Sequence, residues 1–135
     1  MLLEESKAIV RRFTDEVWSQ GKLEVVDEIV APNIIWHGTK INDIEAFKQN
    51  LVGFRTWFSD LCNTIDELVA EGDKVVARMT IRGTHTPTDK QATWTAIGIC
   101  RIADAQIVEM WTNEDVLGRM QQIGYTLVPP EDAEP

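Results

Sequence analysis

The stretch "VVARMTIRGTHTPTDKQATWTAIGICRIADAQIVEMW", from Val75 to Trp111, decides the fold. Apolar and polar residues alternate along most of it, a period typical of strands with one buried face. Two polar segments interrupt the alternation, "TPTDK" at 86–90 and "ADAQ" at 103–106. The stretch therefore predicts three consecutive strands, joined first by a loop and then by a tight turn. A further strand, "NTIDELVA" at 63–70, precedes them across the turn "EGDK" at 71–74.

Helices are expected ahead of these strands. Apolar residues three and four positions apart predict one helix from Glu4 to about Gln20 and a second, shorter one from Leu23 to Val30. Gly21 fits the end of the first helix and Pro32 the end of the second. The β-branched and aromatic segment "NIIWHG" from Asn33 then predicts a short strand.

A third helix and a closing helix complete the pattern. Asn42 and Glu45 have the spacing of a capping box at the start of the third helix. Its apolar stripe runs through Ile44, Phe47, Leu51, Phe54 and Phe58. The closing helix carries Val116, Leu117, Met120 and Ile123 and stops at Gly124.

This order of elements predicts an α+β fold, with an antiparallel meander and the helices gathered on one face. A curved sheet closed by helices encloses a cone, which is either filled with side chains or left as a pocket. The chain has 135 residues, the length of one domain. We expect residues 1–128 to form that domain and residues 129–135 to form an acidic, flexible tail.

Composition excludes several classes of function. The net charge of −9 argues against binding nucleic acid or an anionic membrane surface. No secretory signal and no membrane span is recognisable. Cys62 and Cys100 are isolated, as expected of two buried residues in a reducing cytosol, so we predict a cytoplasmic protein. Phosphate-binding loops, dinucleotide fingerprints and G-x-S-x-G are all lacking.

The chain resembles the SnoaL-like family of the nuclear-transport-factor-2-like fold group. The resemblance rests on the segments "AIVRRFTDEVWSQG", "VVDEIVAPNIIWHG", "ELVAEGDKVVARMTIRGTHT", "ATWTAIGICRIADAQIVEMW" and "DVLGRMQQIG". It implies a cone of helices around a strongly curved antiparallel sheet, with a pocket inside. Enzymes of the family include polyketide cyclases, which close a ring by an intramolecular aldol step without metal or organic cofactor.

The resemblance also implies a site. An acidic residue of the pocket moves the proton in the cyclases, and the matching position is Asp115 in "W-x-x-x-D-x-L-G". Three features depart from the family: Met110 stands where relatives often have His, and the loop "PTDK" is short. The last hairpin has Asp104-Ala105 where relatives often have Asp-Gly. The first two departures lie where a pocket mouth is expected, so they bear on the substrate.

Asp115 has two interpretations. A carboxylate between apolar walls can act as a general acid or base near neutral pH. Asp is equally favoured as the N-cap of a helix, and Asp115 opens the closing helix. In a regular strand Glu109, Trp111, Asn113 and Asp115 share one face, so Trp111 and Asn113 are expected in the pocket if Asp115 is. A buried Glu109 needs a partner, for which Arg78, Arg82 and Arg101 are candidates.

The histidines and tryptophans supply the other candidates. His37 and His85 end strands, where each either polarises a substrate carbonyl or bonds the backbone. Neither has the spacing of a metal ligand, so we predict no metal. Trp36, Trp94 and Trp111 either fill the core or form a flat apolar slot for a planar ligand. Trp18 falls off the stripe of the first helix, which predicts a packing or dimer role.

The sequence thus favours a cofactor-free cyclase, isomerase or hydrolase acting on a small, apolar, carbonyl-bearing molecule, with Asp115 and His37 catalytic. Trp36, His85, Trp94, Trp111 and Asn113 are the predicted substrate-binding residues. One alternative is a ligand-binding or interaction module of the same fold without activity. Another is an epoxide-hydrolase-like enzyme, which needs an Asp–Arg–Asp relay that Asp115 with Arg101 or Arg78 supplies only in part. We expect a homodimer through the outer sheet face.

Overall fold

The computed structural model describes residues 2–131, so the last four residues of the predicted tail lie outside the described part. The elements are α1 (Leu3–Arg12), η1 (Phe13–Ser19), α2 (Leu23–Ile29), β1 (Val30–Trp36), α3 (Ile44–Trp57), β2 (Phe58–Glu71), β3 (Lys74–His85), β4 (Lys90–Ala103), β5 (Gln106–Glu114) and α4 (Val116–Gln122). No helix among the described residues is long and apolar enough to cross a membrane.

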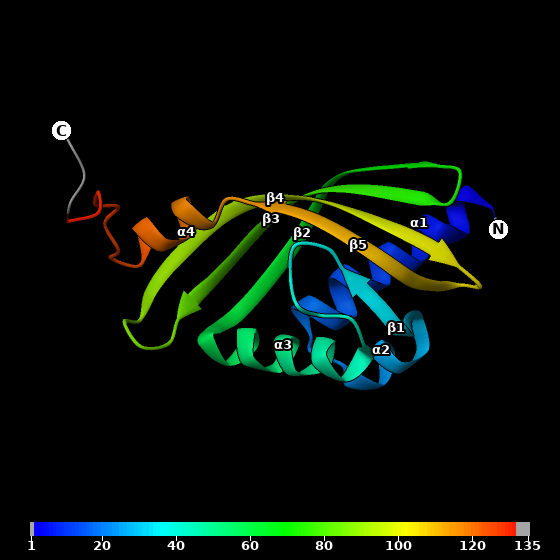
Figure 1. Ribbon diagram of the computed structural model, residues 1–135, viewed down its shortest axis with the longest axis horizontal. Helices are drawn as coiled ribbons and strands as arrows, with labels where there is room; N and C mark the ends of the chain where they lie inside the picture. The colour runs from blue at the N-terminus through cyan, green and yellow to red at the C-terminus, as the bar shows by residue number, and fades with distance from the viewer. Residues whose placement is uncertain (1, 132–135) are drawn as a thin grey trace.

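The strands form one curved sheet in the order β1-β5-β4-β3-β2. The predicted meander of β2 to β5 is antiparallel throughout, and β1 is added at the edge, parallel to β5. Figure 1 shows the sheet arching over α1, α2 and α3, with α4 beside the N-terminal half of β4. The predicted α+β architecture, with a curved sheet and helices on one face, is confirmed.

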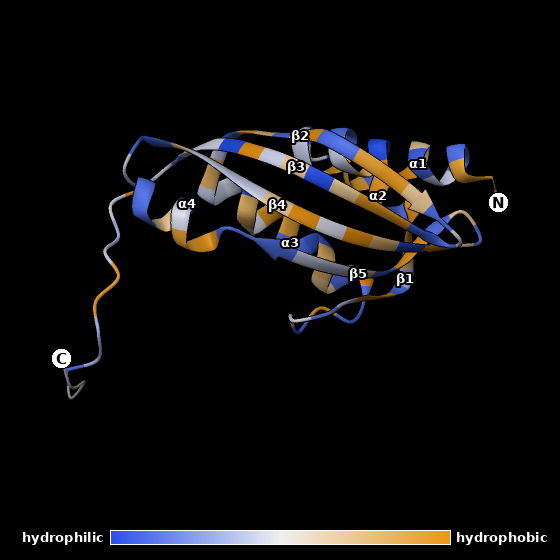
Figure 2. Ribbon diagram, turned by 90° about the horizontal axis from the view of Figure 1, so that it is seen from above, coloured by the Kyte–Doolittle hydropathy of each residue, from blue (hydrophilic) through white to orange (hydrophobic). Residues whose placement is uncertain are grey.

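The core lies between this sheet and the helices. One cluster joins α1, η1, α2 and α3 to the wide end of the sheet, which is the end with the β2–β3 and β4–β5 turns. The cluster surrounds the fully buried Val17, Phe47 and Leu51. A smaller cluster at the other end surrounds Phe58 and Trp94. Along the strands hydrophobic and hydrophilic residues alternate, as expected of a sheet with one covered face (Figure 2).

The first helix changes its winding halfway. Residues Phe13–Ser19 form a π-helix, in which each turn takes in one extra residue. Its C-terminus is held from α3, because the Nη1 of Arg55 donates to the carbonyl oxygens of Trp18 at 2.6 Å and Ser19 at 2.8 Å. Gly21 then turns the chain with a φ of +71°, as predicted for the residue that ends this helix.

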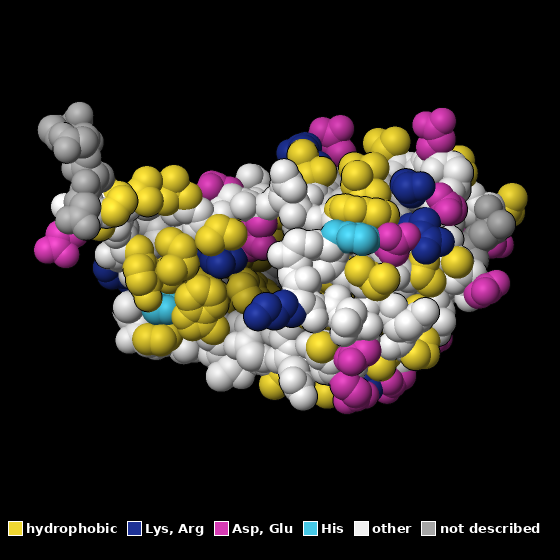
Figure 3. Space-filling view, in the orientation of Figure 1, with side chains coloured by type: hydrophobic (Ala, Val, Ile, Leu, Met, Phe, Trp, Pro, Cys, Tyr) yellow, Lys and Arg dark blue, Asp and Glu magenta, His cyan; other side chains and the backbone are white. Residues whose placement is uncertain are grey.

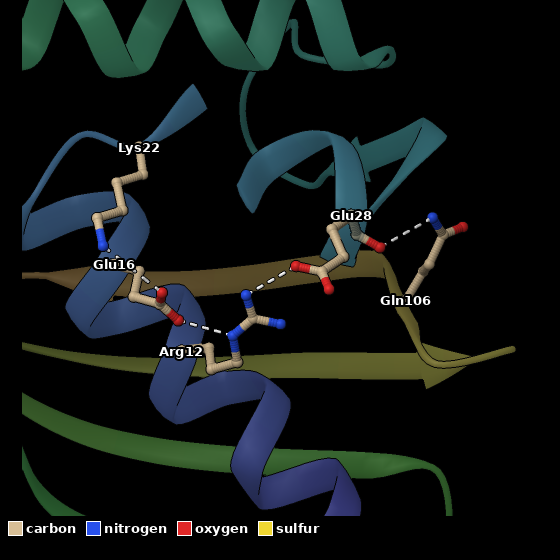
Figure 4. A network of polar contacts seen from close by, with 5 residues as sticks. All are labelled: Arg12, Glu16, Lys22, Glu28 and Gln106. Atoms are coloured by element: carbon tan, nitrogen blue, oxygen red, sulfur yellow. Dashed lines mark hydrogen bonds and ion pairs between the residues drawn. The ribbon is translucent and has the colours of Figure 1, made fainter. Parts of the chain in front are cut away.

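A polar network fixes the helices at the wide end of the sheet (Figure 4). The guanidinium of Arg12 donates to Glu16 at 2.6 Å and to Glu28 at 2.7 Å, which joins α1 to η1 and α2. Lys22 lies 3.8 Å from the other oxygen of Glu16. The backbone carbonyl of Glu28 accepts a bond of 3.3 Å from Gln106 at the start of β5. The network therefore ties the helical layer to the β4–β5 hairpin.

Some predicted boundaries move. The N-cap of α3 is Asp43, whose Oδ1 accepts from Ala46 N at 2.8 Å, and not Asn42. The stripe assigned to α3 ends earlier, because Phe58 is the first residue of β2. The short strand begins at Val30 and contains Pro32, which an edge strand tolerates because it needs no ladder N–H there.

Candidate active site

A cavity of about 300 Å³ lies between the sheet and the helices. Its walls are mostly apolar, with Phe13 and Trp18 from η1, Trp36 from β1 and Phe54 from α3. A few polar side chains interrupt them: Thr14, Thr39, Asn50, Asn63 and Thr112. An apolar pocket of this size with few polar groups is typical of a site for a small organic ligand.

Small residues on the sheet make the room. Ala77, Ala96 and Gly98 line the cavity from β3 and β4. A Cβ built on Gly98 meets nothing closer than the Cε of Met79 at 3.5 Å, an ordinary van der Waals contact. Packing alone therefore leaves space for a side chain at this position.

The winding of η1 explains how Trp18 reaches this wall. In an α-helix Phe13 and Trp18 lie five positions apart on different faces. With i→i+5 hydrogen bonds, as from Gln20 N to Asp15 O at 3.1 Å, they face the same side. Trp18 packs edge-to-face on Phe47, with ring centroids 5.8 Å apart, and lines the cavity.

Glu114 is the acidic residue of the cavity lining within the described chain. It ends β5, where its Oε1 accepts one bond from Trp94 Nε1 and one from Arg119 Nη1, both 2.6 Å long. Its Oε2 accepts no hydrogen bond from any residue between 2 and 131. One oxygen is therefore held in place while the other is left for water or a ligand.

Asp115 lies beside Glu114 but has a different role. Its side chain caps α4, with Oδ1 accepting from the N–H of Gly118 at 2.9 Å. Asp115 is exposed, and it is not among the residues that line the cavity. Of the two interpretations of this residue, the structure shows the helix cap, and it brings Glu114 to the cavity instead.

Strand register explains why Glu114, and not Asp115, lines the cavity. Glu109, Trp111 and Asn113 share a face as expected, but that face is the outer one. Met110, Thr112 and Glu114 point the other way, opposite the inward Cys100, Gly98 and Ala96 of β4. The pocket therefore receives the set of residues that alternates with the predicted one.

His37 lies on this outer face and not in the cavity. Its ring stacks on the indole of Trp111 at 4.8 Å and 9°, and its Nε2 lies 2.7 Å from the Oε2 of Glu109. Arg101 pairs with the other oxygen of Glu109, which confirms one of the three candidate partners. Hydrogen bonds from His37 and Arg101 lower the pKa of the Glu109 carboxyl. Asn113 is exposed nearby, and Trp111 borders the cavity while its ring stacks outside.

Of the remaining predicted residues, one lines the cavity and two lie behind its wall. Trp36 lines the cavity. Trp94 is 2% exposed and does not line the cavity, but its indole N–H donates the hydrogen bond to Glu114 described above. His85 is buried behind the site: its Nδ1 lies 2.8 Å from Thr88 Oγ1, and its ring packs on Trp57 and Phe58. His85 therefore supports the aromatic end of the cavity without lining it.

Three other residues of the lining carry no functional signal in the sequence. The sequence marks Asn63 only as the start of a strand, although its buried Oδ1 has no hydrogen-bond partner among the described residues. Arg119 carries no sequence signal, because its helix reads as a short amphipathic one. Cys100 also lines the cavity, and burial raises the pKa of its thiol to about 12, so it stays protonated.

α4 presents two contrasting sides. Arg119 is 7% exposed and turns to the cavity, whereas Val116 and Leu117 remain 45% and 48% exposed. In the space-filling view hydrophobic side chains gather over this end of the molecule (Figure 3). No group of three or more His, Cys, Asp or Glu side chains within residues 2–131 is arranged to hold a metal ion.

Comparison with known proteins places the chain in a family. The sequence profile of the SnoaL-like polyketide cyclases matches residues 8–123. The chain belongs to the SnoaL-like polyketide cyclase family. The resemblance seen in the sequence is thereby confirmed over most of the chain.

Solved structures with the same fold agree. A candidate polyketide cyclase from Bacillus cereus ATCC 10987 is 32% identical, with a TM-score of 0.80 over 89% of this chain and 80% of that one. Another, from Acidithiobacillus ferrooxidans, is 29% identical, with a TM-score of 0.79 over 91% and 97% of the two chains. TsrD from Streptomyces laurentii shares the fold, at 24% identity and a TM-score of 0.85 over 92% and 98%. Curated proteins give no match.

Proposed function

We propose that this SnoaL-like protein is a cofactor-free enzyme that moves a proton on a small, mostly apolar carbonyl compound, with Glu114 as general acid/base. One observation carries the proposal: Glu114 is a carboxylate in an apolar cavity, with Oε1 fixed by Trp94 and Arg119 and with Oε2 unpartnered among the described residues. A base must be held within reach of the proton that it abstracts and keep a free lone pair.

Family membership supports the type of chemistry. The related candidate cyclases suggest a ring-closing aldol step, which begins by removing a proton next to a carbonyl. An isomerisation through an enolate begins in the same way. The acid of the family pattern falls on Asp115, whose capping bond to Gly118 occupies it elsewhere, so we assign the proton transfer to its neighbour Glu114.

The cavity limits the substrate. Its volume of about 300 Å³ is at the small end for ligand pockets, enough for a compact ring system. Trp18, Trp36 and Phe54 offer aromatic walls to a planar molecule. We therefore expect a small planar ketone or ester, for which burial of apolar surface supplies most of the affinity.

The test is solvent exchange at carbon. The protein is incubated in D₂O with 2-tetralone, a bicyclic ketone, and the loss of the α-proton signals is followed by NMR. We expect exchange faster than in buffer, and a fall of about 10²–10⁴-fold in Glu114→Gln, which keeps an acceptor for Trp94 and Arg119 but cannot take the proton.

Two variants serve as matched controls. Asp115→Asn removes the neighbouring carboxylate but keeps a good N-cap, so exchange should persist. Gly98→Val places a branched side chain in the cavity, where it competes with the ligand for space, and should abolish exchange. Exchange lost in Asp115→Asn and kept in Glu114→Gln contradicts the assignment. No acceleration by the wild-type protein favours the alternative of a binding module without activity.

The epoxide-hydrolase-like alternative finds no support in the arrangement of charges. Arg101 pairs with Glu109, and Arg78 pairs with Glu67, on the outer face of the sheet. Within the described residues the cavity offers one carboxylate, that of Glu114, where a relay around water needs two. We do not propose this activity.

We also propose that the protein forms a homodimer through the outer sheet face. Register places Val69, Val76, Ile99 and Trp111 side by side across four strands, as one apolar row. Val69 is 58% exposed at the edge of this row. Sedimentation equilibrium should give a dimer for the wild type and a monomer for Ile99→Glu. A monomeric wild type overturns the proposal.

A further inference from the structure

Arg119 has more hydrogen-bond donors than its surroundings use. A guanidinium carries five N–H donors. Among the described residues its one hydrogen bond is that of Nη1 with Glu114, and its Nε is buried without a partner. The side chain is only 9% exposed, so few of its remaining donors reach water, and Nε reaches none. A buried cation with spare donors costs free energy unless something else accepts from it.

Aromatic rings hold the guanidinium in place. Its Cζ lies 5.2 Å from the ring centre of Trp57 and 5.4 Å from those of Phe54 and Trp94, with Phe58 at 6.0 Å. Cation–π attraction offsets part of the cost of burying the charge. It supplies no hydrogen-bond acceptor in the plane of the guanidinium, however. The four rings therefore fix the position of Arg119 but accept no hydrogen bond from its in-plane N–H groups.

The unmatched donors and the base belong to the same cavity. Arg119 and Glu114 both line it, and their side chains meet at Glu114 Oε1. A ligand oxygen bound to the free N–H groups of Arg119 lies next to the carboxylate. The carbon next to that carbonyl group would then lie on the side of Glu114, whose Oε2 is free to accept its proton. This is the arrangement that removal of a proton beside a carbonyl requires.

We infer that Arg119 is the binding site for the oxygen atom of the substrate, which is a carbonyl oxygen in the ground state and an enolate oxygen after proton transfer. Glu114 takes the proton, the C–H electron pair forms the new C=C bond, and the carbonyl π pair moves onto the oxygen that Arg119 binds. Return of the proton to carbon reverses each change. The inference deepens the proposed function and rests on it for the role of Glu114.

The substrate class becomes narrower as a result. The ligand carries its carbonyl at the edge of a planar apolar framework, with an enolisable C–H beside it. A free carboxylate is disfavoured at the same place, because the charge of Glu114 lies against Arg119 and repels a second anion. The framework extends away from α4 toward Trp18 and Trp36 at the other walls of the cavity.

Naphthols test the oxygen site without any turnover. In Glu114→Gln the base is replaced by a neutral group of the same shape, and 2-naphthol mimics a planar enol. We expect 2-naphthol to bind at least about tenfold more tightly than 2-methylnaphthalene, which lacks the oxygen, because a hydrogen bond to a charged group is worth that much. More acidic ring-substituted naphthols should bind more tightly still and show the absorption of the naphtholate.

A second substitution separates binding from structure. Arg119→Met in the Glu114→Gln background should abolish the preference for naphthol over 2-methylnaphthalene, and Arg119→Lys should keep part of it. A purely structural Arg119 predicts equal losses for both compounds. A preference that survives Arg119→Met, or failure of 2-naphthol to bind Glu114→Gln, overturns the inference. The exchange assay tests Glu114 separately, since the oxygen site can be present in a protein that exchanges no proton.

Discussion

The carboxylate of Asp115 and the backbone N–H of Gly118 form the N-cap of α4, with 2.9 Å between Oδ1 and N. This contact needs a glycine. A Cβ built on Gly118 lies 2.2 Å from Asp115 Oδ2, closer than any two such atoms approach. The cap and an alanine at this position therefore exclude each other, although alanine is the better helix former.

The contact predicts coupling between Asp115 and Gly118. Asp115→Ala should cost about 1 kcal/mol of unfolding free energy through loss of the cap. Gly118→Ala should be near neutral alone, because lost capping offsets a gain of about 1 kcal/mol in helix propensity. In the Asp115→Ala background, Gly118→Ala should instead stabilise. Urea unfolding of the wild type, the two single variants and the double variant measures this double-mutant cycle. Additive effects of the two substitutions contradict the predicted coupling.

Glu109 predicts a dependence of stability on pH. Hydrogen bonds from His37 and then Arg101 hold the pKa of its carboxyl below the ordinary 4.5. The folded-state pKa is thus lower than the unfolded one, so the stabilisation is complete above the ordinary pKa and is lost as the pH falls through the folded one. Between about pH 6 and about pH 3, Glu109→Gln should lose less unfolding free energy than the wild type.

A second carboxylate provides the comparison. Glu71, the last residue of β2, forms no ion pair with any residue between 2 and 131, so Glu71→Gln should follow the pH profile of the wild type. Unfolding in urea at several pH values measures all three proteins. If the unfolding free energies of Glu109→Gln and the wild type depend on pH in the same way, the His37–Glu109–Arg101 group does not stabilise the fold as predicted.

Gly21 and Gly53 should respond to alanine with opposite signs. Gly21 has a φ of +71°, and a Cβ there lies 2.4 Å from the Nε of Arg55, which caps η1. We expect Gly21→Ala to cost about 2 kcal/mol from the left-handed backbone alone, and more if Arg55 is displaced. Gly53 is exposed in α3 with nothing within 4 Å of its Cβ position, so Gly53→Ala should stabilise by about 1 kcal/mol.

Thermal or chemical unfolding of the two single variants gives both values. Loss of stability in Gly53→Ala would show that α3 is constrained by something other than helix propensity. A neutral Gly21→Ala would mean that the junction between η1 and α2 relaxes at little cost, and that Arg55 is not a tight cap.

Local chemistry made much of the fold predictable. The alternation from Val75 to Trp111 predicts three strands that the structure contains at nearly the same bounds. Turn residues such as Gly72 act within a few positions, so their effect is visible in the sequence. The pairing of β1 with β5 is different, because no local pattern records which edge a short strand joins.

The candidate site was less predictable, for two physical reasons. The alternation along β5 predicts correctly which side chains share a face. It does not predict which face points into the cavity, and the choice between Glu114 and Asp115 depends on that face. The π-helix η1 is in contact with Phe47, on which Trp18 packs, and with Arg55, which caps its end, and both partners are remote in sequence. Arg119 acquires its surroundings from α3, β2 and β4, which only the folded chain brings together.

The β4–β5 hairpin contains a strained residue that a single substitution should relieve. Asp104 and Ala105 form its two-residue turn with φ values of +52° and +62°. Asp tolerates this left-handed region, whereas Ala has no side-chain hydrogen bond to offset the strain. A turn with both φ values positive favours Gly at the second position. We therefore expect Ala105→Gly to stabilise the protein by about 1 kcal/mol, despite the greater freedom of Gly in the unfolded chain.

A matched substitution isolates the backbone effect. Ala70 lies within β2, opposite Val75, where the backbone is regular. Ala70→Gly should destabilise by about 0.5–1 kcal/mol, the usual cost of Gly in a strand. Opposite signs for the two Ala→Gly changes in urea unfolding locate the strain in the turn, because both remove one methyl group. If Ala105→Gly also destabilises, the turn is not strained and the packing of the Ala105 methyl group outweighs its φ.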